Sequence, residues 1–473
     1  KTITLSPKEA TMKKKPNILF LMSDEHRFDI SGFAGNPIIR TPHLDHLAKD
    51  AVVFNNAYTP APICIPARQC MAAGQLPRTC GVEVYGEDLP INYQTFAKTL
   101  AQNGYKTVAA GKLHHYGIDQ MQGWLQRIAG DCEVSLKHYL EKDQSTISTS
   151  DNTIGMLQSG LKWDDKKEIL RAGPGISAYA RKDQLAIQGT KDFIYQYFID
   201  SYYDRATPEQ PLLLYVGLLN PHYPYIAEQE LFDYYLNRVK LYENQEPFNH
   251  PFLGKCSNYE PLIPGKNISV RDIKRAMAAY YANVETIDRQ FGEVMKALEN
   301  AGQNLDDWII IYTSDHGEML GEHAIWEKQR FFEGSVKIPL FIRYPQRFGK
   351  TIVKENVNLI DLFATLCELT NTPIPGGLDS RSLVPLLEGK ADKWNNETIS
   401  QFNGINLMIK QNNIKYQWYE TDASEVLFDL EKDPTESRNL ICEPMYQPLL
   451  PAFRKRRDEL GFGPNADPHY KNA

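Results

Sequence analysis

The chain has 473 residues, a length that corresponds to about two to four domains. Hydrophobic residues make up 42% of it and charged residues 23%, which excludes a disordered or collagen-like protein. The 52 Lys and Arg against 59 Asp and Glu give a net charge of −7, so we expect no general binding to nucleic acid or to an anionic membrane. An anionic substrate would therefore need a local cationic pocket.

The cysteines and the N-terminus indicate little about the compartment. The 7 Cys are an odd number without a CxxC pair, which predicts neither a zinc site nor a redox dithiol. The first residues are polar, and the longest apolar stretch (212–219) is far too short to span a bilayer. We expect a periplasmic or secreted protein if a signal peptide has been removed, and a cytoplasmic one otherwise.

Four apolar runs along the chain each end in polar or ionisable residues. Residues 17–22 lead into SDEH, 107–110 into GKLH, 212–219 into NPH and 308–313 into SDHG. Continuous apolar runs of this length are typical of strands buried on both faces of a parallel sheet. Because parallel strands place their carboxyl ends at one edge, we expect these polar residues to share one cleft.

Helical segments lie between the strand candidates. Residues 42–51 follow a Thr41-Pro42 opening, and 271–300 carry apolar residues spaced three and four apart until Gly302. Strands alternating with helices predict an α/β fold, an open sandwich with helices on both faces of the sheet. Residues 130–175 are polar and irregular, and we interpret them as an insertion near the mouth of the cleft.

The C-terminal part differs in pattern from the rest. The segment PIPGG at 373–377 marks a turn, and after it come short strand candidates at 405–409 and 414–419 and a terminal helix. We therefore predict a main domain over 13–385 and a smaller C-terminal α+β subdomain over 386–473.

The sharpest local motif is Cys64-Ile65-Pro66-Ala67-Arg68. The proline can open a helix, so Cys64 lies near a helix N-terminus, where backbone N–H groups favour negative charge. Arg68 adds a fixed bidentate donor one turn later. The segment is suited to an anion or an activated nucleophile, and the alternative is a cysteine that serves as a small buried apolar residue.

Two polar pairs, Asp24-Glu25 and Asp315-His316, come after predicted strands. Three carboxylates in one cleft repel one another unless a cation neutralises them, and hard oxygen ligands indicate Ca²⁺, with Mg²⁺ as the alternative, rather than zinc. The competing interpretation is two pairs of solvated turn residues.

Four further residues supply what an anionic transition state needs. Lys112 and Lys328 offer fixed positive charge, and His114 and His222 offer imidazoles for proton transfer. Taken singly, each is also explained as a solvated lysine or a packed histidine.

Together these motifs resemble the type I sulfatases of the alkaline phosphatase superfamily, from about Pro16 to the C-terminus. The Cys64-x-Pro66-x-Arg68 core is similar to the segment that maturation enzymes oxidise to Cα-formylglycine. Ala67 stands where the family most often has Ser. Further blocks match in the family's order: PNIL at 16–19, TPHLD at 41–45, GKLH at 111–114, PHYP at 221–224 and SDHG at 314–317.

The resemblance implies an alkaline-phosphatase-like three-layer sandwich with a central mixed sheet, whose main domain is catalytic. It implies that Asp24, Glu25, Asp315 and His316 hold the cation, and that oxidised Cys64 completes the shell. Glu25 stands where a second Asp is more frequent, and a longer carboxylate can still reach a flexible Ca²⁺ shell.

The resemblance also implies roles in the reaction. The hydrated aldehyde of residue 64 would attack sulfur, held by Arg68 and Lys112. Lys328 and His222 would contact the sulfate, and one of the two would help to protonate the leaving alcohol. His114 would then take the proton of the second hydroxyl, which expels sulfate and regenerates the aldehyde.

The substrate is predicted from finer similarities. Residues 314–328 are similar to iduronate 2-sulfatases and to choline-sulfatase-like members, and other segments to bacterial enzymes that remove 2-O-sulfate from the uronic acid of glycosaminoglycans. We therefore expect an exo-acting carbohydrate sulfatase whose partners are a sulfated sugar and a formylglycine-generating maturation enzyme. By proximity to the motifs, we expect His115, Arg78 and Arg330 to meet the uronate carboxylate, although ordinary surface charges explain them equally well.

Two other functions remain open from the sequence. One is a phosphonate or phosphate ester hydrolase of the same superfamily. The other is a non-catalytic glycan-binding relative in which Cys64 keeps its thiol.

Overall fold

The computed structural model describes residues 15–131, 165–199, 208, 210–255 and 260–466. Most of the predicted insertion at 130–175 lies outside the described residues. Among the described helices, none combines the length and the hydropathy that crossing a bilayer requires.

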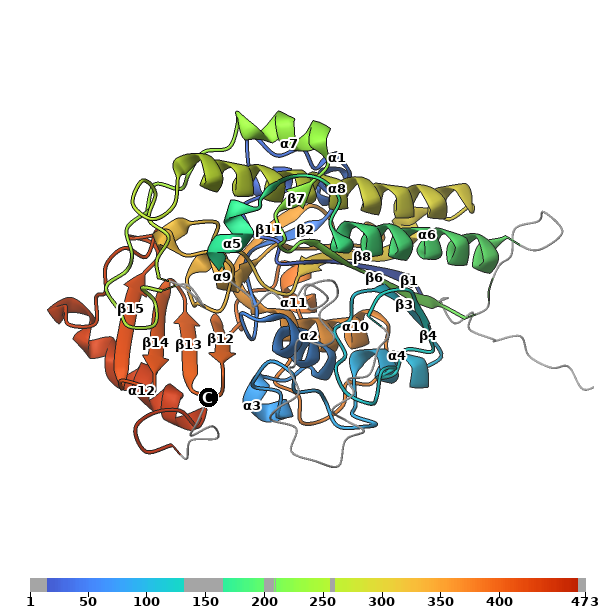
Figure 1. The fold of residues 1–473 in the computed structure, drawn as a ribbon. Helices are drawn as coiled ribbons and strands as arrows, with labels where there is room; N and C mark the ends of the chain where they lie inside the picture. The colour runs from blue at the N-terminus through green and yellow to red at the C-terminus, as the bar shows by residue number, and fades with distance from the viewer. Residues whose placement is uncertain (1–14, 132–164, 200–207, 209, 256–259, 467–473) are drawn as a thin grey trace, which may run out of the picture.

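A mixed sheet of nine strands forms the centre of the main domain (Figure 1). Strands β8, β1, β6 and β3 lie side by side and are parallel, whereas β10 runs antiparallel to both of its neighbours. In sheet order the strands are β11 (Thr351–Asn358), β2 (Val52–Tyr58), β10 (Leu340–Arg343), β8 (Trp308–Ser314), β1 (Asn17–Asp24), β6 (Leu212–Pro221), β3 (Lys106–Gly111) and β4 (Gln126–Ile128), with β9 (Lys337–Ile338) paired to β2.

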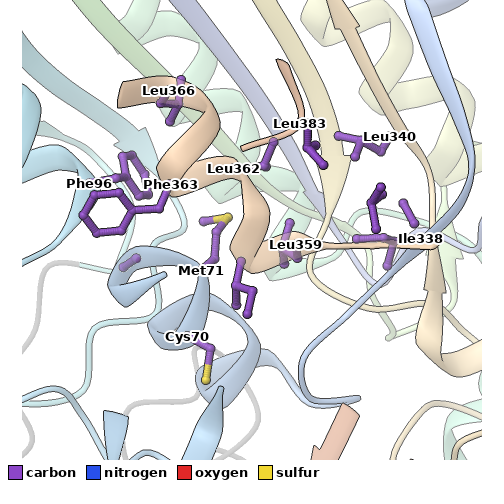
Figure 2. Packing of buried hydrophobic residues seen from close by; sticks show 14 of the residues in the cluster. Cys70, Met71, Phe96, Ile338, Leu340, Leu359, Leu362, Phe363, Leu366 and Leu383 are labelled. Atoms are coloured by element: carbon purple, nitrogen blue, oxygen red, sulfur yellow. The ribbon is translucent and has the colours of Figure 1, made fainter. Parts of the chain in front are cut away.

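Helices cover both faces of this sheet (Figure 1). Three of them pack on one face: α1 (Pro42–Ala48), α6 (Ala178–Phe198) and α8 (Val270–Asn300). Three others pack on the opposite face: α2 (Cys64–Ala73), α4 (Phe96–Gln102) and α10 (Leu362–Leu369). Figure 2 shows the second layer, in which Met71 of α2, Phe96 of α4 and Phe363 of α10 meet. The result is a three-layer sandwich, as predicted.

The side chains of β1 show why the layers form. Ile18, Phe20 and Met22 belong to the core under α2, α4 and α10, whereas Leu19 and Leu21 belong to the core under α6 and α8. Successive residues of a strand point to opposite faces, so an uninterrupted apolar run is needed where both faces are covered.

The predicted elements of the main domain are confirmed with small changes of boundary. The four apolar runs are β1, β3, β6 and β8, and the predicted helix at 271–300 is α8. The helix predicted over 42–51 ends at Ala48, and the chain then enters β2 at Val52. Thr41 makes no side-chain cap to this helix, because its hydroxyl donates to Asp45 and accepts from the backbone N–H of Gly32.

The C-terminal part contains a small antiparallel sheet, as expected for an α+β subdomain (Figure 1). Its strands are β12 (Glu397–Phe402), β13 (Asn406–Gln411), β14 (Ile414–Tyr419) and β15 (Ser424–Asp429), followed by α12 (Leu450–Glu459). The boundary between residues 385 and 386 stays a prediction.

A buried ion-pair network joins the small sheet to the main domain. The Lys415 side chain on β14 is fully buried, and its Nζ lies 2.7 Å from carboxylate oxygens of both Glu333 and Glu436. Glu333 opens the short helix α9 (Glu333–Val336) beside β9. We predict that Lys415→Met lowers the free energy of unfolding by about 3–5 kcal/mol, because two buried carboxylates lose their shared cation.

Urea denaturation measures this loss. Lys296→Met is the matched control, because Lys296 pairs with Glu299 on α8 with both side chains exposed, and an exposed pair contributes about 0–1 kcal/mol. An equally small loss in both variants would show that the Lys415 network does not stabilise the contact between the sheets.

Candidate active site

The carboxyl ends of β1 and β8 bring two of the predicted pairs together. Ser23 and Ser314 are register partners of these parallel strands, so the residues after them emerge at the same edge of the sheet. Asp24, Glu25 and Asp315 are completely buried there, as is His316. Buried carboxylates at this spacing require compensating cations.

The turn after β1 is held in an unusual backbone conformation. Glu25 has a φ of 63°, in the left-handed region that is costly for residues other than glycine. Its backbone N–H donates to Asp315 Oδ1 at 3.0 Å, and its carbonyl accepts from the Tyr280 hydroxyl on α8. These contacts hold the Glu25 carboxylate away from Asp315 and toward the cationic side of the site.

Cys64 is the first residue of α2, after the extended residue Ile63. Its Sγ lies 3.1 Å from His316 Nε2 and 3.8 Å from Asp24 Oδ1. Burial, together with Asp24, raises the pKa of the Cys64 thiol to about 11. A thiol with this pKa is mostly protonated at neutral pH, and therefore a weak nucleophile in its unmodified form.

A divalent cation fits between these groups. Asp24, Cys64, Asp315 and His316 each offer one ligand atom, and the four atoms lie within 4.8 Å of one another. His316 Nδ1 lies 3.0 Å from the Gly317 carbonyl oxygen, which can only accept, so Nε2 presents its lone pair toward Cys64.

Glu25 lies in a second group, with Asp24 and His222. Its Oε2 pairs with Lys328 Nζ at 2.8 Å, whereas its buried Oε1 has no hydrogen-bond partner among the described residues. A buried carboxylate oxygen without a donor is available to a cation. Glu25 as a metal ligand stays a prediction.

Lys112 and Lys328 bring positive charge to the buried carboxylates. Lys112 Nζ lies 2.6 Å from Asp24 Oδ2, after a turn in which Gly111 has a φ of 77° and a Cβ would lie 1.9 Å from the Gly217 carbonyl oxygen. Burial is the largest single influence and disfavours an ammonium group, but Asp24, Cys64 and Asp315 together raise the pKa of Lys112. In the same way, Cys64, Glu25 and Asp24 together raise the pKa of Lys328 against the effect of burial. Both lysines are therefore charged at neutral pH.

His114 and His222 are both neutral and have different partners. Burial, reinforced by Lys328, lowers the pKa of His222, whose Nδ1 donates to the Tyr223 carbonyl and whose Nε2 lies 2.7 Å from Lys328 Nζ. Burial, reinforced by Lys112, lowers the pKa of His114, and its buried Nδ1 has no hydrogen-bond partner among the described residues. His114 is therefore a neutral base whose Nδ1 can accept a proton. His222 accepts a hydrogen bond from Lys328 at Nε2.

Arg68 lies beneath the acids and links them. Its Nη2 lies 2.9 Å from Asp24 Oδ2, its Nε lies 2.8 Å from Asp315 Oδ2, and its Nη1 donates to the Tyr215 hydroxyl. Burial is the largest single influence and disfavours the charged guanidinium, but Asp315, Tyr215 and Asp24 together raise the pKa of Arg68. Direct contact between Arg68 and residue 64 stays a prediction.

The three residues expected to meet a uronate carboxylate have other partners. His115 Nδ1 lies 3.0 Å from the Gln120 carbonyl oxygen, and Arg330 donates to the Lys255 carbonyl oxygen at 2.8 Å. Arg78 donates to the carbonyl oxygens of Gly404 and Gly461 and lies over the ring of Phe462. Their contact with substrate stays a prediction.

Arg78 anchors the C-terminal part, and this has a measurable consequence. We predict that Arg78→Met lowers the free energy of unfolding by about 1–3 kcal/mol, because partly buried carbonyl groups lose their donor. The KM of the same variant shows whether Arg78 also meets the substrate. Thermal melting and steady-state kinetics check both, with the exposed Arg181→Met on α6 as control. A raised KM with unchanged melting would instead assign Arg78 to the substrate.

Three tyrosines of the site were not predicted. The Tyr223 hydroxyl lies 3.3 Å from Lys328 Nζ. Tyr179 has its ring edge-on to His222, and Tyr85 has its ring edge-on to His114. Among 26 tyrosines, only Tyr223 carries a sequence signal, its place within the PHYP motif.

Comparison with known proteins identifies the family. The sulfatase family profile matches residues 16–372, well over half of the chain. The chain belongs to the sulfatase family. A second profile, the C-terminal part of N-sulphoglucosamine sulphohydrolase, matches residues 321–461 of this sulfatase. The enzyme is a sulfuric ester hydrolase, and its family generally uses formylglycine and a divalent metal.

Two relatives cover nearly the whole sulfatase. The arylsulfatase of Clostridium perfringens is 29% identical over 465 residues, which are 93% of each protein. The choline-sulfatase of Rhizobium meliloti is also 29% identical, over 94% of this chain and 86% of the relative.

Two solved structures share the fold. The phosphonate monoester hydrolase of Agrobacterium radiobacter has a TM-score of 0.74 at 21% identity, over 94% of this chain and 95% of the other. A protein described as a 2-O GAG sulfatase has a TM-score of 0.66 at 20% identity, over 94% and 92%. At these identities the likeness shows the alkaline-phosphatase-like fold alone.

Proposed function

We propose that this sulfatase removes O-sulfate from carbohydrates, acting from the end of glycosaminoglycan oligosaccharides, with the 2-O-sulfate of a uronic acid as its preferred group. The observation that carries the proposal is the composition of the site around Cys64. Asp24, Asp315 and His316 form one side, and the charged Lys112 and Lys328 stand close enough to Cys64 to lower the pKa of its thiol. Such a site concentrates positive charge where a sulfate group would bind.

The substrate class rests on similarity. The segments around Cys64 are similar to bacterial uronate 2-O-sulfatases, and residues 314–328 are similar both to iduronate 2-sulfatases and to choline-sulfatase-like members. The structural neighbour described as a 2-O GAG sulfatase has the same fold. A uronate carboxylate and a sulfate are both anionic, which agrees with the cations gathered around the buried acids of an otherwise acidic chain.

Two groups complete this site. We propose that Asp24, Asp315 and His316 hold Ca²⁺, with Mg²⁺ as the alternative, and that Glu25 adds its unpartnered Oε1; the bound cation supplies positive charge beside residue 64. Oxidation of Cys64 to formylglycine by a maturation enzyme supplies an oxygen nucleophile in place of a thiol of pKa about 11.

The remaining residues bind sulfate and move protons. Lys112 is a buried ammonium group that holds the oxidised residue 64, and Lys328, also buried, contacts sulfate oxygens and stabilises the charge that develops on them. Lys328 carries the proton nearest the leaving alcohol, and His222 orients it by accepting at Nε2. His114, neutral and with Nδ1 unpartnered among the described residues, takes a proton at that atom when residue 64 is regenerated.

Arg68 acts through the acids in this proposal. Its guanidinium bridges Asp24 and Asp315, so it fixes the two carboxylates at the spacing that a shared cation needs.

A panel of position-defined sulfated saccharides tests the proposed function. We expect the matured enzyme to release free sulfate from disaccharides with a 2-O-sulfated terminal uronic acid at least about tenfold faster than from 6-O- or N-sulfated isomers. No release from the 2-O-sulfated members would overturn the substrate assignment. A paired assay with aryl sulfate and aryl phosphonate monoesters is the control for reaction class, because preference for phosphorus would contradict sulfate ester hydrolysis as the main activity.

A further inference from the structure

Two tyrosines stand next to the two histidines of the site. The ring of Tyr179 lies 5.5 Å from that of His222, and the ring of Tyr85 lies 5.8 Å from that of His114, both edge to face. Tyr179 comes from the first turn of α6, and Tyr85 from the loop after α3 (Pro77–Cys80). Two segments distant in sequence thus each place a tyrosine beside a proposed proton-transfer residue.

Tyr179 is buried, but it lies outside the three apolar clusters of the described residues. Only 4% of it is exposed. Its hydroxyl makes no hydrogen bond to another described residue. Burial raises the pKa of this hydroxyl, whereas the charges of Lys112 and Lys328 act in the opposite direction. The hydroxyl is therefore protonated and can donate a hydrogen bond.

Tyr85 lies farther out, because its side chain is only partly buried whereas Tyr179 is buried. It is also near enough to Tyr179 to affect the pKa of that hydroxyl. The pair therefore extends from the buried lysines toward solvent, along the two histidines. In a sulfatase the sulfate enters such a site first, and the rest of the substrate remains on the solvent side.

We propose that Tyr179 and Tyr85 form a subsite for the leaving group of the sulfate ester. The Tyr179 hydroxyl donates a hydrogen bond to an oxygen of that group, and the ring of Tyr85 packs against the face of its pyranose or aryl ring. That the leaving group is a sugar rests on the proposed function. The position beside His222 supports the subsite, since the leaving oxygen must lie near the Lys328 and His222 pair that protonates it.

The alternative is that Tyr179 only orients His222 through ring contact. The two roles predict different results for Tyr179→Phe, because phenylalanine keeps the ring contact and loses only the hydroxyl. The variant keeps its activity if Tyr179 only orients His222, and it loses activity if the hydroxyl binds the leaving group. The two roles also predict different effects on the binding of inorganic sulfate, because sulfate occupies the site without a leaving group. A subsite for the leaving group leaves sulfate binding unchanged, whereas a displaced His222 weakens it.

The experiment compares Tyr179→Phe, Tyr85→Phe and Tyr85→Ala in the matured full-length enzyme. Sulfate release from the best sugar sulfate of the panel gives kcat/KM, and competitive inhibition by inorganic sulfate reports the sulfate pocket alone. Tyr195→Phe is the control, an exposed tyrosine on the same helix α6. Melting curves identify any variant that fails to fold.

We expect Tyr179→Phe to lower kcat/KM about three- to tenfold, as for one lost hydrogen bond, with inhibition by sulfate unchanged. Tyr85→Ala lowers kcat/KM to a similar extent, and Tyr85→Phe and Tyr195→Phe retain it. Wild-type rates in both Tyr179→Phe and Tyr85→Ala, or weakened inhibition by sulfate in parallel with the loss of rate, would overturn the subsite.

Failure of the proposed function gives a different result. If the wild-type enzyme cleaves aryl sulfates but no sugar sulfate, the carbohydrate assignment is wrong, and the same variants are measured with the aryl sulfate. A loss of kcat/KM with unchanged inhibition by sulfate then supports the subsite with an aromatic leaving group, and unchanged kcat/KM overturns it.

Discussion

Replacing Cys64 with alanine is expected to abolish sulfate release, by at least about 10³-fold in kcat, because residue 64 supplies the nucleophile. The fold is expected to survive. Cys64 is the first residue of α2, and its sulfur faces Asp24 and His316 rather than the apolar core. The loss of one buried sulfur there costs little compared with a truncation in the core.

Release of free sulfate measures the loss of turnover, and thermal melting shows whether the fold survives. Cys70→Ala is the matched control, since Cys70 is a buried cysteine of the same helix whose sulfur contacts Cys80 instead of the acids. We expect this control to keep its activity. Residual turnover in Cys64→Ala, or loss of its cooperative melting while Cys70→Ala melts normally, would refute the role given to Cys64.

Replacing Asp315 with asparagine is expected to weaken cation binding at least about tenfold, which corresponds to about 1.4 kcal/mol. The carboxylate lies in the four-residue group with Asp24, Cys64 and His316, and it also pairs with Arg68. The amide keeps the shape but loses the negative charge, so both the cation and the guanidinium lose a partner.

Titration calorimetry with Ca²⁺ measures the affinity without relying on turnover. Asp192→Asn on α6 makes the same change of net charge at an exposed position, and we expect it to bind Ca²⁺ like the wild type. Equal affinities in Asp315→Asn and Asp192→Asn would show that the cation binds elsewhere.

The arrangement of the acids could be predicted from the sequence for a simple reason. Each apolar run is long enough to be a strand buried on both faces, and parallel strands bring the residues at their carboxyl ends to one edge of the sheet. Asp24 and Asp315 therefore meet although they are far apart in sequence, and Lys112 joins them from the end of β3. The helix opened near Pro66 places Cys64 against them.

Side-chain directions could not be predicted in the same way. The left-handed backbone of Glu25 turns its carboxylate toward Lys328, and the fork of Arg68 faces the acids. Both outcomes depend on turns and rotamers that spacing along the chain does not reveal. Sequence proximity likewise did not reveal that the guanidinium groups of Arg78 and Arg330 donate to main-chain carbonyls, and their contact with substrate stays a prediction.

The arrangement of the site explains how a chain with a net charge of −7 can bind an anionic substrate. Arg68, Lys112 and Lys328 are all buried near Asp24 and Asp315. These three cations are thus gathered at one buried site while the chain as a whole is acidic, so the net charge limits nonspecific binding of polyanions and leaves the site able to bind a sulfate ester.

The mass of the peptide that contains Cys64 tests the oxygen nucleophile most directly, when it is measured in preparations made with and without a maturation enzyme. We predict that active preparations show the mass loss for exchange of the thiol for an aldehyde, and that sulfate release per molecule rises in proportion to the modified fraction. Full activity in a preparation whose Cys64 peptides all keep the thiol mass would contradict the mechanism.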